Sequence, residues 1–188
     1  MTKHIKAILL GYTGVGKTSY VTTANGLGID DVNSSTGVNF NIFSFDDPEY
    51  DMHLWDTAGQ DRYMDQVSLY YRDSYIVFFV TACKLQNEKI EVEEQNDKSL
   101  VAYMNSITEV LSYDNIIPIF ILNKIDAYND NPFSEMECEA LKNREEHVKQ
   151  LIIKTRPELK DKLHFYSVSC KLKYKVNESL EEAFDLAV

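Results

Sequence analysis

The stretch Gly11-Tyr12-Thr13-Gly14-Val15-Gly16-Lys17-Thr18 decides the fold of this chain. It matches the pattern G-x-x-x-x-G-K-[ST], and it lies between an apolar run at residues 5–10 and a segment of helical period that begins near Lys17. Glycines allow the backbone to form a nest whose N–H groups point at phosphate oxygens, and the N-terminus of the following helix adds positive potential. The stretch therefore predicts a phosphate-binding loop between a buried strand and a helix.

This phosphate loop supplies a charge and a hydroxyl beside its backbone nest. The motif places the Lys17 ammonium at the β- and γ-phosphates of a nucleotide and the Thr18 hydroxyl on a Mg²⁺ ion. The nucleotide-binding residues that we predict for this segment are Thr13, Gly14, Val15, Gly16, Lys17, Thr18 and Ser19.

The rest of the chain alternates apolar runs with segments of helical period, which is typical of βαβ units around a parallel sheet. Buried strands are predicted at residues 5–10, 75–82, 116–122 and 164–168, and an antiparallel hairpin at 38–45 and 49–55. Helices are predicted to begin near Lys17, Asp61, Asp97, Glu135 and Asn177, the last with Asn177 as its N-cap. The segments 84–96 and 126–133 are expected to be surface loops or insertions. The predicted fold is an α/β domain with a mixed, mainly parallel six-stranded sheet and helices on both faces.

A second motif, Asp56-Thr57-Ala58-Gly59-Gln60, follows the second strand of the hairpin. In this place the Asp56 carboxylate can hold a metal-bound water, the Gly59 N–H can meet a γ-phosphate, and Gln60 can orient a water. The pattern D-x-x-G is common by chance, so a cap at the end of the strand is the alternative role for Asp56.

Two further motifs, Asn123-Lys124-Ile125-Asp126 and Ser169-Cys170-Lys171, each end a predicted buried strand. The Asp126 carboxylate can accept hydrogen bonds from N1–H and the exocyclic amine of guanine, a pair of donors that adenine lacks. The stems of Lys124 and Lys171 can cover the two sides of the base and ribose. The Cys170 N–H suits the guanine O6. The guanine site that we predict consists of Asn123, Lys124, Asp126, Ser169, Cys170 and Lys171.

Composition excludes several other classes of protein. The 188 residues carry 30 acidic and 19 basic side chains, and the net charge of −11 opposes binding to nucleic acid or anionic lipid over a broad surface. Three cysteines without CxxC spacing favour neither a disulfide framework nor a zinc site, and they suit a reducing, cytoplasmic setting. Because the four histidines, at positions 4, 53, 147 and 164, are scattered, we expect no metal site among them.

The order of the four motifs resembles that of the small GTPases of the Ras superfamily across nearly the whole chain. Residues 55–63, the run Tyr70-Tyr71-Arg72 and the run Gly37-Val38-Asn39-Phe40 are most similar to the Rab branch. The long segment before Ser169 is instead similar to the insert of the Rho branch. The resemblance implies one P-loop NTPase G domain over residues 1–188, with insertions near 84–96 and 127–160.

The same resemblance implies that the chain binds GTP or GDP with Mg²⁺ and hydrolyses GTP slowly, with Gln60 and Lys17 as catalytic residues. It implies a monomer that a GTPase-activating protein, an exchange factor and effectors recognise through two switch segments. For the Rab branch, the implied process is membrane and vesicle traffic.

The first switch departs from the family pattern in two respects. The family places a Mg²⁺-binding hydroxyl in this switch. Spacing from Thr18 selects Thr36 for that role, whereas alignment on the run that begins at Gly37 selects Ser35, and we favour Thr36. The other predicted metal ligands are Thr18 and, through a water molecule, Asp56.

The second departure is that residues 24–39 contain no aromatic ring to cover the guanine, and Leu27 or Ile29 would replace one poorly. Because an aromatic contact adds about 0.5–1.5 kcal/mol beyond area burial, we predict nucleotide affinity roughly threefold to tenfold weaker.

Two other functions are compatible with parts of the sequence. A nucleotide-binding scaffold with little or no turnover would fit the altered first switch, and an ATP-dependent kinase would need a base site other than Asp126. No membrane anchor is expected within this chain, because the apolar run at 74–83 is too short to cross a bilayer and residues 184–188 contain no cysteine to prenylate. We therefore expect a cytoplasmic protein that would reach a membrane only through a segment outside this sequence.

Overall fold

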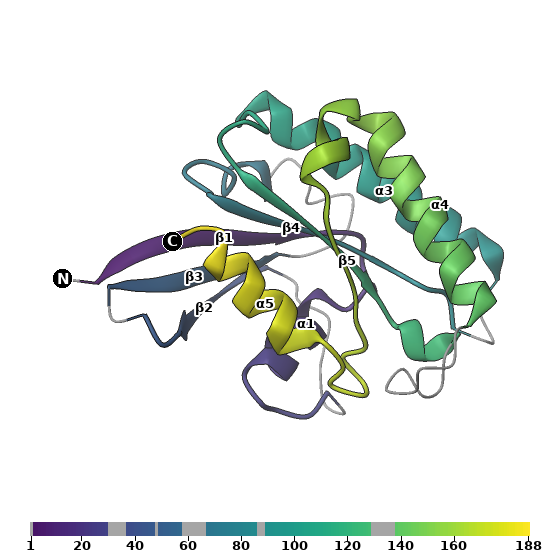
Figure 1. Cartoon of the computed structure of the whole chain (residues 1–188), viewed down its shortest axis with the longest axis horizontal. Helices are drawn as coiled ribbons and strands as arrows, with labels where there is room; N and C mark the ends of the chain where they lie inside the picture. Colours follow the sequence, from purple (N-terminus) through teal and green to yellow (C-terminus); the bar gives the residue numbers. More distant parts are fainter. Residues whose placement is uncertain (1, 30–36, 48, 58–66, 86–88, 129–137) are drawn as a thin grey trace.

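The computed structural model describes residues 2–29, 37–47, 49–57, 67–85, 89–128 and 138–188. Six strands form one sheet in the order β2-β3-β1-β4-β5-β6 (Figure 1). The β2–β3 pair is antiparallel, and the other four neighbouring pairs are parallel. The mixed, mainly parallel six-stranded sheet predicted from the sequence is therefore confirmed.

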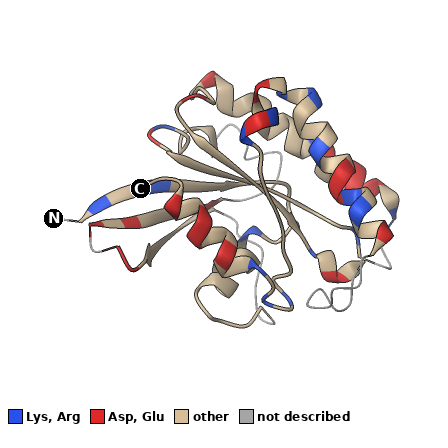
Figure 2. Ribbon diagram, viewed as in Figure 1, with Lys and Arg blue, Asp and Glu red and all other residues tan. Residues whose placement is uncertain are grey.

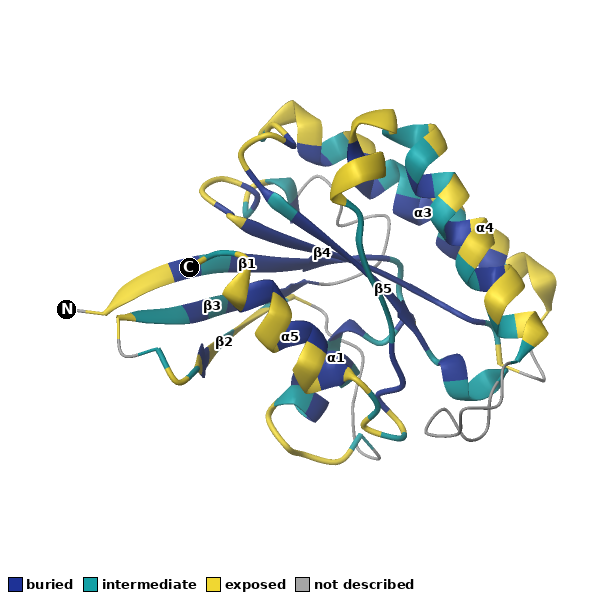
Figure 3. Ribbon diagram, viewed as in Figure 1, coloured by how far each residue is buried: buried dark blue, intermediate teal, exposed yellow. Residues whose placement is uncertain are grey.

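The central strands of the sheet are buried on both faces. β4 (Ile76–Ala82) is buried at every position, and β5 (Ile117–Asn123) at all but its first, as Figure 3 shows. Neither strand carries a charged residue, and Figure 2 shows charges on the helices and on the strands β1 and β3 instead. Strands covered on both sides need continuous apolar runs, which is why these two were recognisable in the sequence.

The remaining strands flank this pair and lie close to their predicted positions. β1 and β6 span Lys3–Leu10 and His164–Ser167, and the hairpin strands β2 and β3 span Val38–Ser44 and Tyr50–Thr57. In the hairpin, β2 exposes most of its residues because it is the edge of the sheet.

Helices cover both faces of the sheet (Figure 1). On one face α1 (Lys17–Ala24) and α5 (Val176–Asp185) contribute Tyr20, Leu180 and Phe184 to the core. On the other face lie α3 (Ile90–Ser106) and α4 (Glu139–Thr155). Three short 3₁₀ helices complete the described elements: η2 (Ile107–Glu109), η3 (Ile125–Ala127) and η4 (Pro157–Lys162).

Two helix starts differ from the sequence prediction. α3 begins at Ile90 rather than near Asp97, so the second half of the segment 84–96 is helical and not a surface loop. Glu93 and Asn96 are buried there, because Glu93 pairs with Arg144 on α4 and the Asn96 amide donates to the Ala82 carbonyl oxygen.

α5 begins at Val176, so the prediction of Asn177 as its N-cap is wrong. The cap position belongs to Lys175, whose backbone is left-handed with φ of 53°, and no side chain caps this helix start. Val176 is buried in the core, and the first turn begins two residues earlier than the capping pattern suggests.

Other expected elements lie partly outside the described residues. The helix expected from Asp61 falls largely on residues 58–66, and the expected loop at 126–133 is described only as far as residue 128, one position after the end of η3. The start expected at Glu135 also lies outside, and the described helix begins at Glu139. Among the helices that the structure describes, none is long and apolar enough to span a membrane.

Candidate nucleotide-binding site

Four motifs meet at one edge of the sheet because the strands that precede them are parallel. β1 leads into the phosphate loop, β3 carries Asp56 near its end, β5 ends at Asn123, and Ser169 follows β6 (Figure 1). Ligands of open α/β sheets bind outside the carboxyl ends of the strands, which is this edge. Figure 1 also places α1 directly behind the phosphate loop.

The backbone of the phosphate loop requires glycine at two positions. Gly16 has φ of 97°, and a Cβ atom there would lie 2.3 Å from Asn123 Nδ2. Gly11 has φ of 155°, and its Cβ would lie 2.2 Å from the Val80 carbonyl oxygen. Side chains at these positions would clash with atoms of two other strand ends, so glycine allows the loop to approach the sheet closely.

Lys17 extends from the first turn of α1 back across the phosphate loop. Its ammonium donates hydrogen bonds to the carbonyl oxygens of Gly11 and Tyr12 at 2.9 and 3.0 Å. Burial lowers the Lys17 pKa from 10.5 to about 8, and the nearby Asp56 carboxylate opposes this effect. The charged form still predominates at neutral pH, so the loop presents a buried cation with the Asp56 carboxylate as a neighbour.

Thr18 and Asp56 form the second polar pair at this edge. The Thr18 hydroxyl donates a 2.7 Å hydrogen bond to Asp56 Oδ2, and the Asp56 side chain is almost fully buried. The next residue, Thr57, donates a 2.6 Å hydrogen bond to the Leu9 carbonyl oxygen and so fixes the end of β3 against β1. A buried carboxylate beside a hydroxyl is a donor set that suits Mg²⁺, which prefers oxygen ligands. The residues present therefore fit the predicted ion.

The base motifs are joined by side-chain hydrogen bonds. Asp126 Oδ1 accepts a 2.6 Å hydrogen bond from the Ser169 hydroxyl, and the Lys171 ammonium lies 3.9 Å from Asp126 Oδ2. Asn123 donates from Nδ2 to the Val15 carbonyl oxygen at 2.9 Å. The structure thus brings both base motifs and the phosphate loop into one cluster.

A cavity of about 300 Å³ lies within this cluster. Its lining residues are Gly14, Gly16, Ser19, Ile29, Leu85, Asn123, Lys124, Asp126, Cys170 and Lys171. Eight of these ten belong to the site predicted from the sequence, so the segments that carry the motifs border one cavity. The volume lies at the lower end of the range of ligand pockets, about 300–1,000 Å³.

Cys170 differs in detail from its expected role. Its backbone N–H, expected to face a base oxygen, donates to Asn123 Oδ1 at 3.3 Å. Burial raises the pKa of its thiol to about 12, so the side chain is a protonated, inert group in this wall.

Leu85 is the cavity residue that sequence reasoning missed. It follows β4 in a segment whose glutamates suggested only a solvated surface, and its 38% exposed side chain lines the cavity together with Ile29. An exposed leucine directly after a buried strand was the available signal. Both side chains are aliphatic, and no aromatic side chain lines this cavity among the described residues.

An ion-pair network lies behind the cavity and connects α3 with α4. The buried Arg144 guanidinium donates to both carboxylate oxygens of Asp97 at 2.8 and 2.9 Å, and its Nε lies 3.4 Å from Glu93 Oε1. Glu93 Oε1 also accepts from the Lys84 N–H at 2.9 Å and from the Tyr128 hydroxyl at 3.1 Å. The network therefore holds Lys84, which precedes the cavity residue Leu85, and Tyr128, which lies two positions after Asp126.

Four residues of the predicted site lie outside the described residues. They are Ser35, Thr36, Gly59 and Gln60. Their assignments to the metal, the γ-phosphate and the attacking water stay predictions.

The fold and this edge define an α/β nucleotide-binding protein with a phosphate loop. Comparison with known families identifies it further: the family model described as "Ras of Complex, Roc, domain of DAPkinase" matches residues 6–126. The chain belongs to this family of Ras-type domains, and its relatives make it a divergent, Rab-like member of the Ras superfamily.

Three of these relatives show the extent of the similarity. The chain is 25% identical to Rab-37 of Homo sapiens over 94% of its own length and 77% of that protein. It is 27% identical to Rab-26 of Drosophila melanogaster over 92% of its length and 43% of that protein. It is 25% identical to RABC1 of Arabidopsis thaliana over 70% of its length and 60% of that protein. The matches thus cover less than two thirds of RABC1 and of Rab-26.

Proposed function

We propose that this protein is a guanine-nucleotide switch that binds GTP, hydrolyses it slowly to GDP and phosphate, and differs in shape between the two states. The observation that carries the proposal is the meeting of Lys17, Thr18 and Asp56 with Asn123 and Asp126 at one edge of the sheet. A cation, a metal-binding pair and a base-reading carboxylate are the three parts that a nucleoside triphosphate requires.

In this proposal, the residues of the chain bind and orient GTP rather than react with it. The Lys17 ammonium, held at the Gly11 and Tyr12 carbonyl oxygens, stabilises negative charge on the β- and γ-phosphates. Thr18 directly and Asp56 through water hold Mg²⁺, which supplies further positive charge when bound. Gln60 orients the attacking water, and Thr36 and Gly59 contact the γ-phosphate, so that its loss releases both switches.

Asp126 selects guanine through the hydrogen bonds that its carboxylate accepts. The Ser169 hydroxyl and the Lys171 ammonium hold this carboxylate in place. A base that offers no matching donors would leave this partly buried carboxylate without the two hydrogen bonds that guanine supplies, and such a mismatch is strongly rejected.

The Rab relatives support a role in membrane and vesicle traffic, in which a GTPase-activating protein, an exchange factor and effectors recognise the switches. We propose that the protein acts in this way from the cytoplasm as a monomer.

Single-turnover phosphate release tests the catalytic part of the proposal. The protein loaded with GTP and Mg²⁺ should release phosphate faster than GTP in buffer, and Gln60→Leu should remove most of this acceleration while GTP stays bound. GTP binding without any acceleration of phosphate release would instead support a nucleotide-binding scaffold with little or no turnover. The aliphatic cavity wall at Ile29 and Leu85 is the observation that favours this alternative.

The base-reading part is tested separately by Asp126→Asn. An amide at this position offers a donor where guanine also offers one, so preference should change from guanosine to xanthosine diphosphate. Competition binding of the two nucleotides to both proteins measures this change. Unchanged guanine selectivity would contradict the role of Asp126, and equal competition by ATP would favour a kinase.

A further inference from the structure

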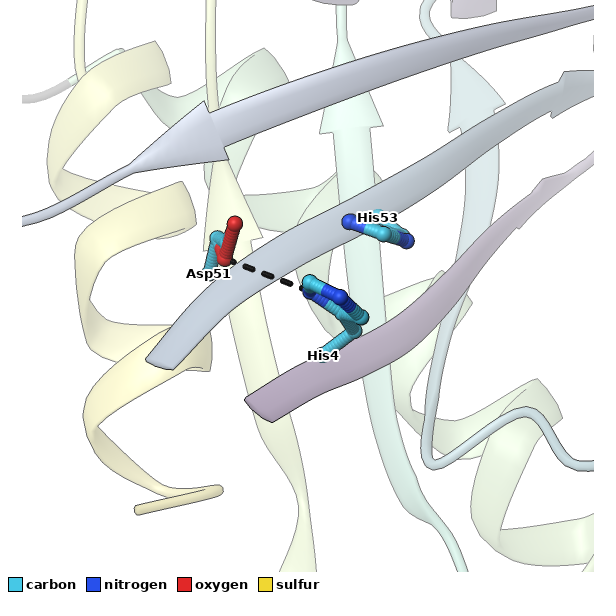
Figure 4. A group of neighbouring side chains, drawn as sticks. All are labelled: His4, Asp51 and His53. Carbon is cyan, nitrogen blue, oxygen red and sulfur yellow. Dashed lines mark ion pairs between the residues drawn. The ribbon is translucent and has the colours of Figure 1, made fainter. Parts of the chain in front are cut away.

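A cluster of two histidines and an aspartate lies at the end of the sheet opposite the nucleotide edge. β1 and β3 run parallel with His4 opposite Asp51, and His53 follows Asp51 by two residues on β3. Side chains alternate along a strand, so Asp51 and His53 share a face, and Figure 4 shows the His4 ring between them on that face. The scattered positions of the histidines in the sequence predict no such cluster, because 47 residues separate His4 from Asp51 and only the strand register brings them together.

The distances within the cluster are close to those of a metal site. His4 Nδ1 lies 3.6 Å from Asp51 Oδ1, and the centroids of the His4 and His53 rings are 4.1 Å apart. One ligand atom from each of the three residues lies within 4.8 Å of the others. Ligand atoms of a tetrahedral Zn²⁺ with bonds of about 2.1 Å are about 3.4 Å apart. Side-chain rotations that bring the ligand atoms about 1 Å closer to one another would therefore complete the site without moving the strands.

Two further observations point to a cation at this place. Among the residues that the structure describes, no donor forms a hydrogen bond to Asp51 Oδ1, although this oxygen is buried. A buried carboxylate oxygen without a hydrogen bond is costly, and a metal ion would satisfy it. Desolvation and the neighbouring His4 lower the pKa of His53, which favours the neutral form of the ring that a metal ion requires.

The surroundings leave the cluster open on one side. His4 is 54% exposed, which gives an ion access from solvent, whereas the Phe40 ring packs edge-on against His53 at 5.1 Å. The nearest lysine on the same face of β1 is Lys6, and its ammonium donates to the Arg72 carbonyl oxygen and lies over the Trp55 ring. Two imidazoles and one carboxylate thus lie together with an open side toward solvent, and because the two rings are stacked at 18° at least one of them would rotate to direct its nitrogen at a shared ion.

We propose that His4, Asp51 and His53 bind a divalent transition-metal ion of the Zn²⁺ type. Imidazole ligands favour such ions, whereas Mg²⁺ and Ca²⁺ prefer sites made of oxygen atoms only. The site is separate from the Mg²⁺ site of Thr18 and Asp56, which lies at the other end of β1 and β3. A bound ion would clamp the first residues of β1 to those of β3 and stabilise the fold without contacting the nucleotide.

The test is a titration of the metal-free full chain with Zn²⁺ alone, with a chromophoric chelator as competitor. The wild type should bind one Zn²⁺ that excess Mg²⁺ does not displace. His4→Ala should weaken this binding at least tenfold, since the loss of supporting groups alone commonly costs about 10- to 100-fold. His164→Ala, which removes a lone histidine at the start of β6, is the matched control and should bind Zn²⁺ as the wild type does.

Three more measurements separate a built site from loss of structure. Asp51→Asn keeps the shape of the side chain and should also weaken Zn²⁺ binding, and Zn²⁺ should raise the melting temperature of the wild type but not of His4→Ala. Zn²⁺ should shift the ring nitrogen resonances of His4 and His53 and leave those of His147 and His164 unchanged. Equal Zn²⁺ affinity in the wild type, His4→Ala and His164→Ala, or no saturable binding to the wild type, would overturn the proposal.

Discussion

Asn123 donates a 2.9 Å hydrogen bond from its amide nitrogen to the carbonyl oxygen of Val15 in the phosphate loop. Its amide oxygen accepts the Cys170 N–H at 3.3 Å. One buried side chain at the end of β5 therefore joins the loop that would hold phosphates to the loop that would hold the base. The same side chain lies against Gly16, where a Cβ atom would be 2.3 Å from its nitrogen.

Asn123→Ala should destabilise the protein and accelerate nucleotide release. The change leaves the Val15 carbonyl and the Cys170 N–H without these partners in the interior, at about 1–3 kcal/mol for each group that stays unsatisfied. A loss of 1.4 kcal/mol in the bound state corresponds to roughly tenfold weaker binding of GDP. Urea unfolding and displacement of a fluorescent GDP analogue measure the two effects. Asn115→Ala, at an exposed position, is the control and should change neither.

Arg144→Met should lower the free energy of unfolding by about 3–5 kcal/mol, because it leaves the buried Glu93 carboxylate and the partly buried Asp97 carboxylate without this cation. Chemical denaturation of both proteins measures this loss. The triple variant with Glu93→Gln and Asp97→Asn as well should recover part of it, since no buried charge then remains in the network. A single variant as stable as the wild type would show that the network carries little energy.

The central strands and the site motifs could be predicted because their signals are local. Apolar runs without charge identify strands buried on both faces, and each motif directly follows such a run. Once the strands are predicted to be parallel, the motifs that follow their carboxyl ends are expected to lie together. Asn123 therefore lies against Gly16, and Ser169 against Asp126.

The errors concern features that depend on distant residues. The start of α3 was missed because Glu93 is polar in the sequence and becomes buried only through Arg144, 51 positions later in the chain. The cluster of His4, Asp51 and His53 depends on the pairing of β1 with β3, and no spacing along the chain reveals that pairing. Leu85 was missed because its segment was interpreted from its charges alone.

Ile29→Phe should slow the release of GDP roughly threefold to tenfold. Ile29 lines the cavity of the base motifs, where an aromatic ring could lie against the guanine and add about 0.5–1.5 kcal/mol. Displacement of labelled GDP by excess unlabelled GDP gives the dissociation rate. Leu27→Phe is the matched control, because Leu27 is 61% exposed and does not line this cavity. Identical GDP dissociation rates in the wild type and Ile29→Phe would contradict the prediction.

Lys17→Met should change the pH dependence of stability of the nucleotide-free protein. Burial lowers the Lys17 pKa from 10.5 in the unfolded chain to about 8 in the native state. Between pH 8 and 10.5 the unfolded chain therefore binds more protons at this group, so its contribution makes the free energy of unfolding rise with pH, by about 3 kcal/mol in all. Below pH 8 the cost of the buried charge is present in full.

The difference between the two proteins isolates this contribution from those of other titrating groups. The stability of Lys17→Met relative to the wild type should be greatest below pH 8 and should fall as the pH approaches 10.5, because the wild type then loses its buried charge. Urea unfolding in EDTA at several pH values between 7 and 10.5 measures this difference. A difference that is constant over this range would show that Lys17 titrates alike in both states and that its burial has no electrostatic cost.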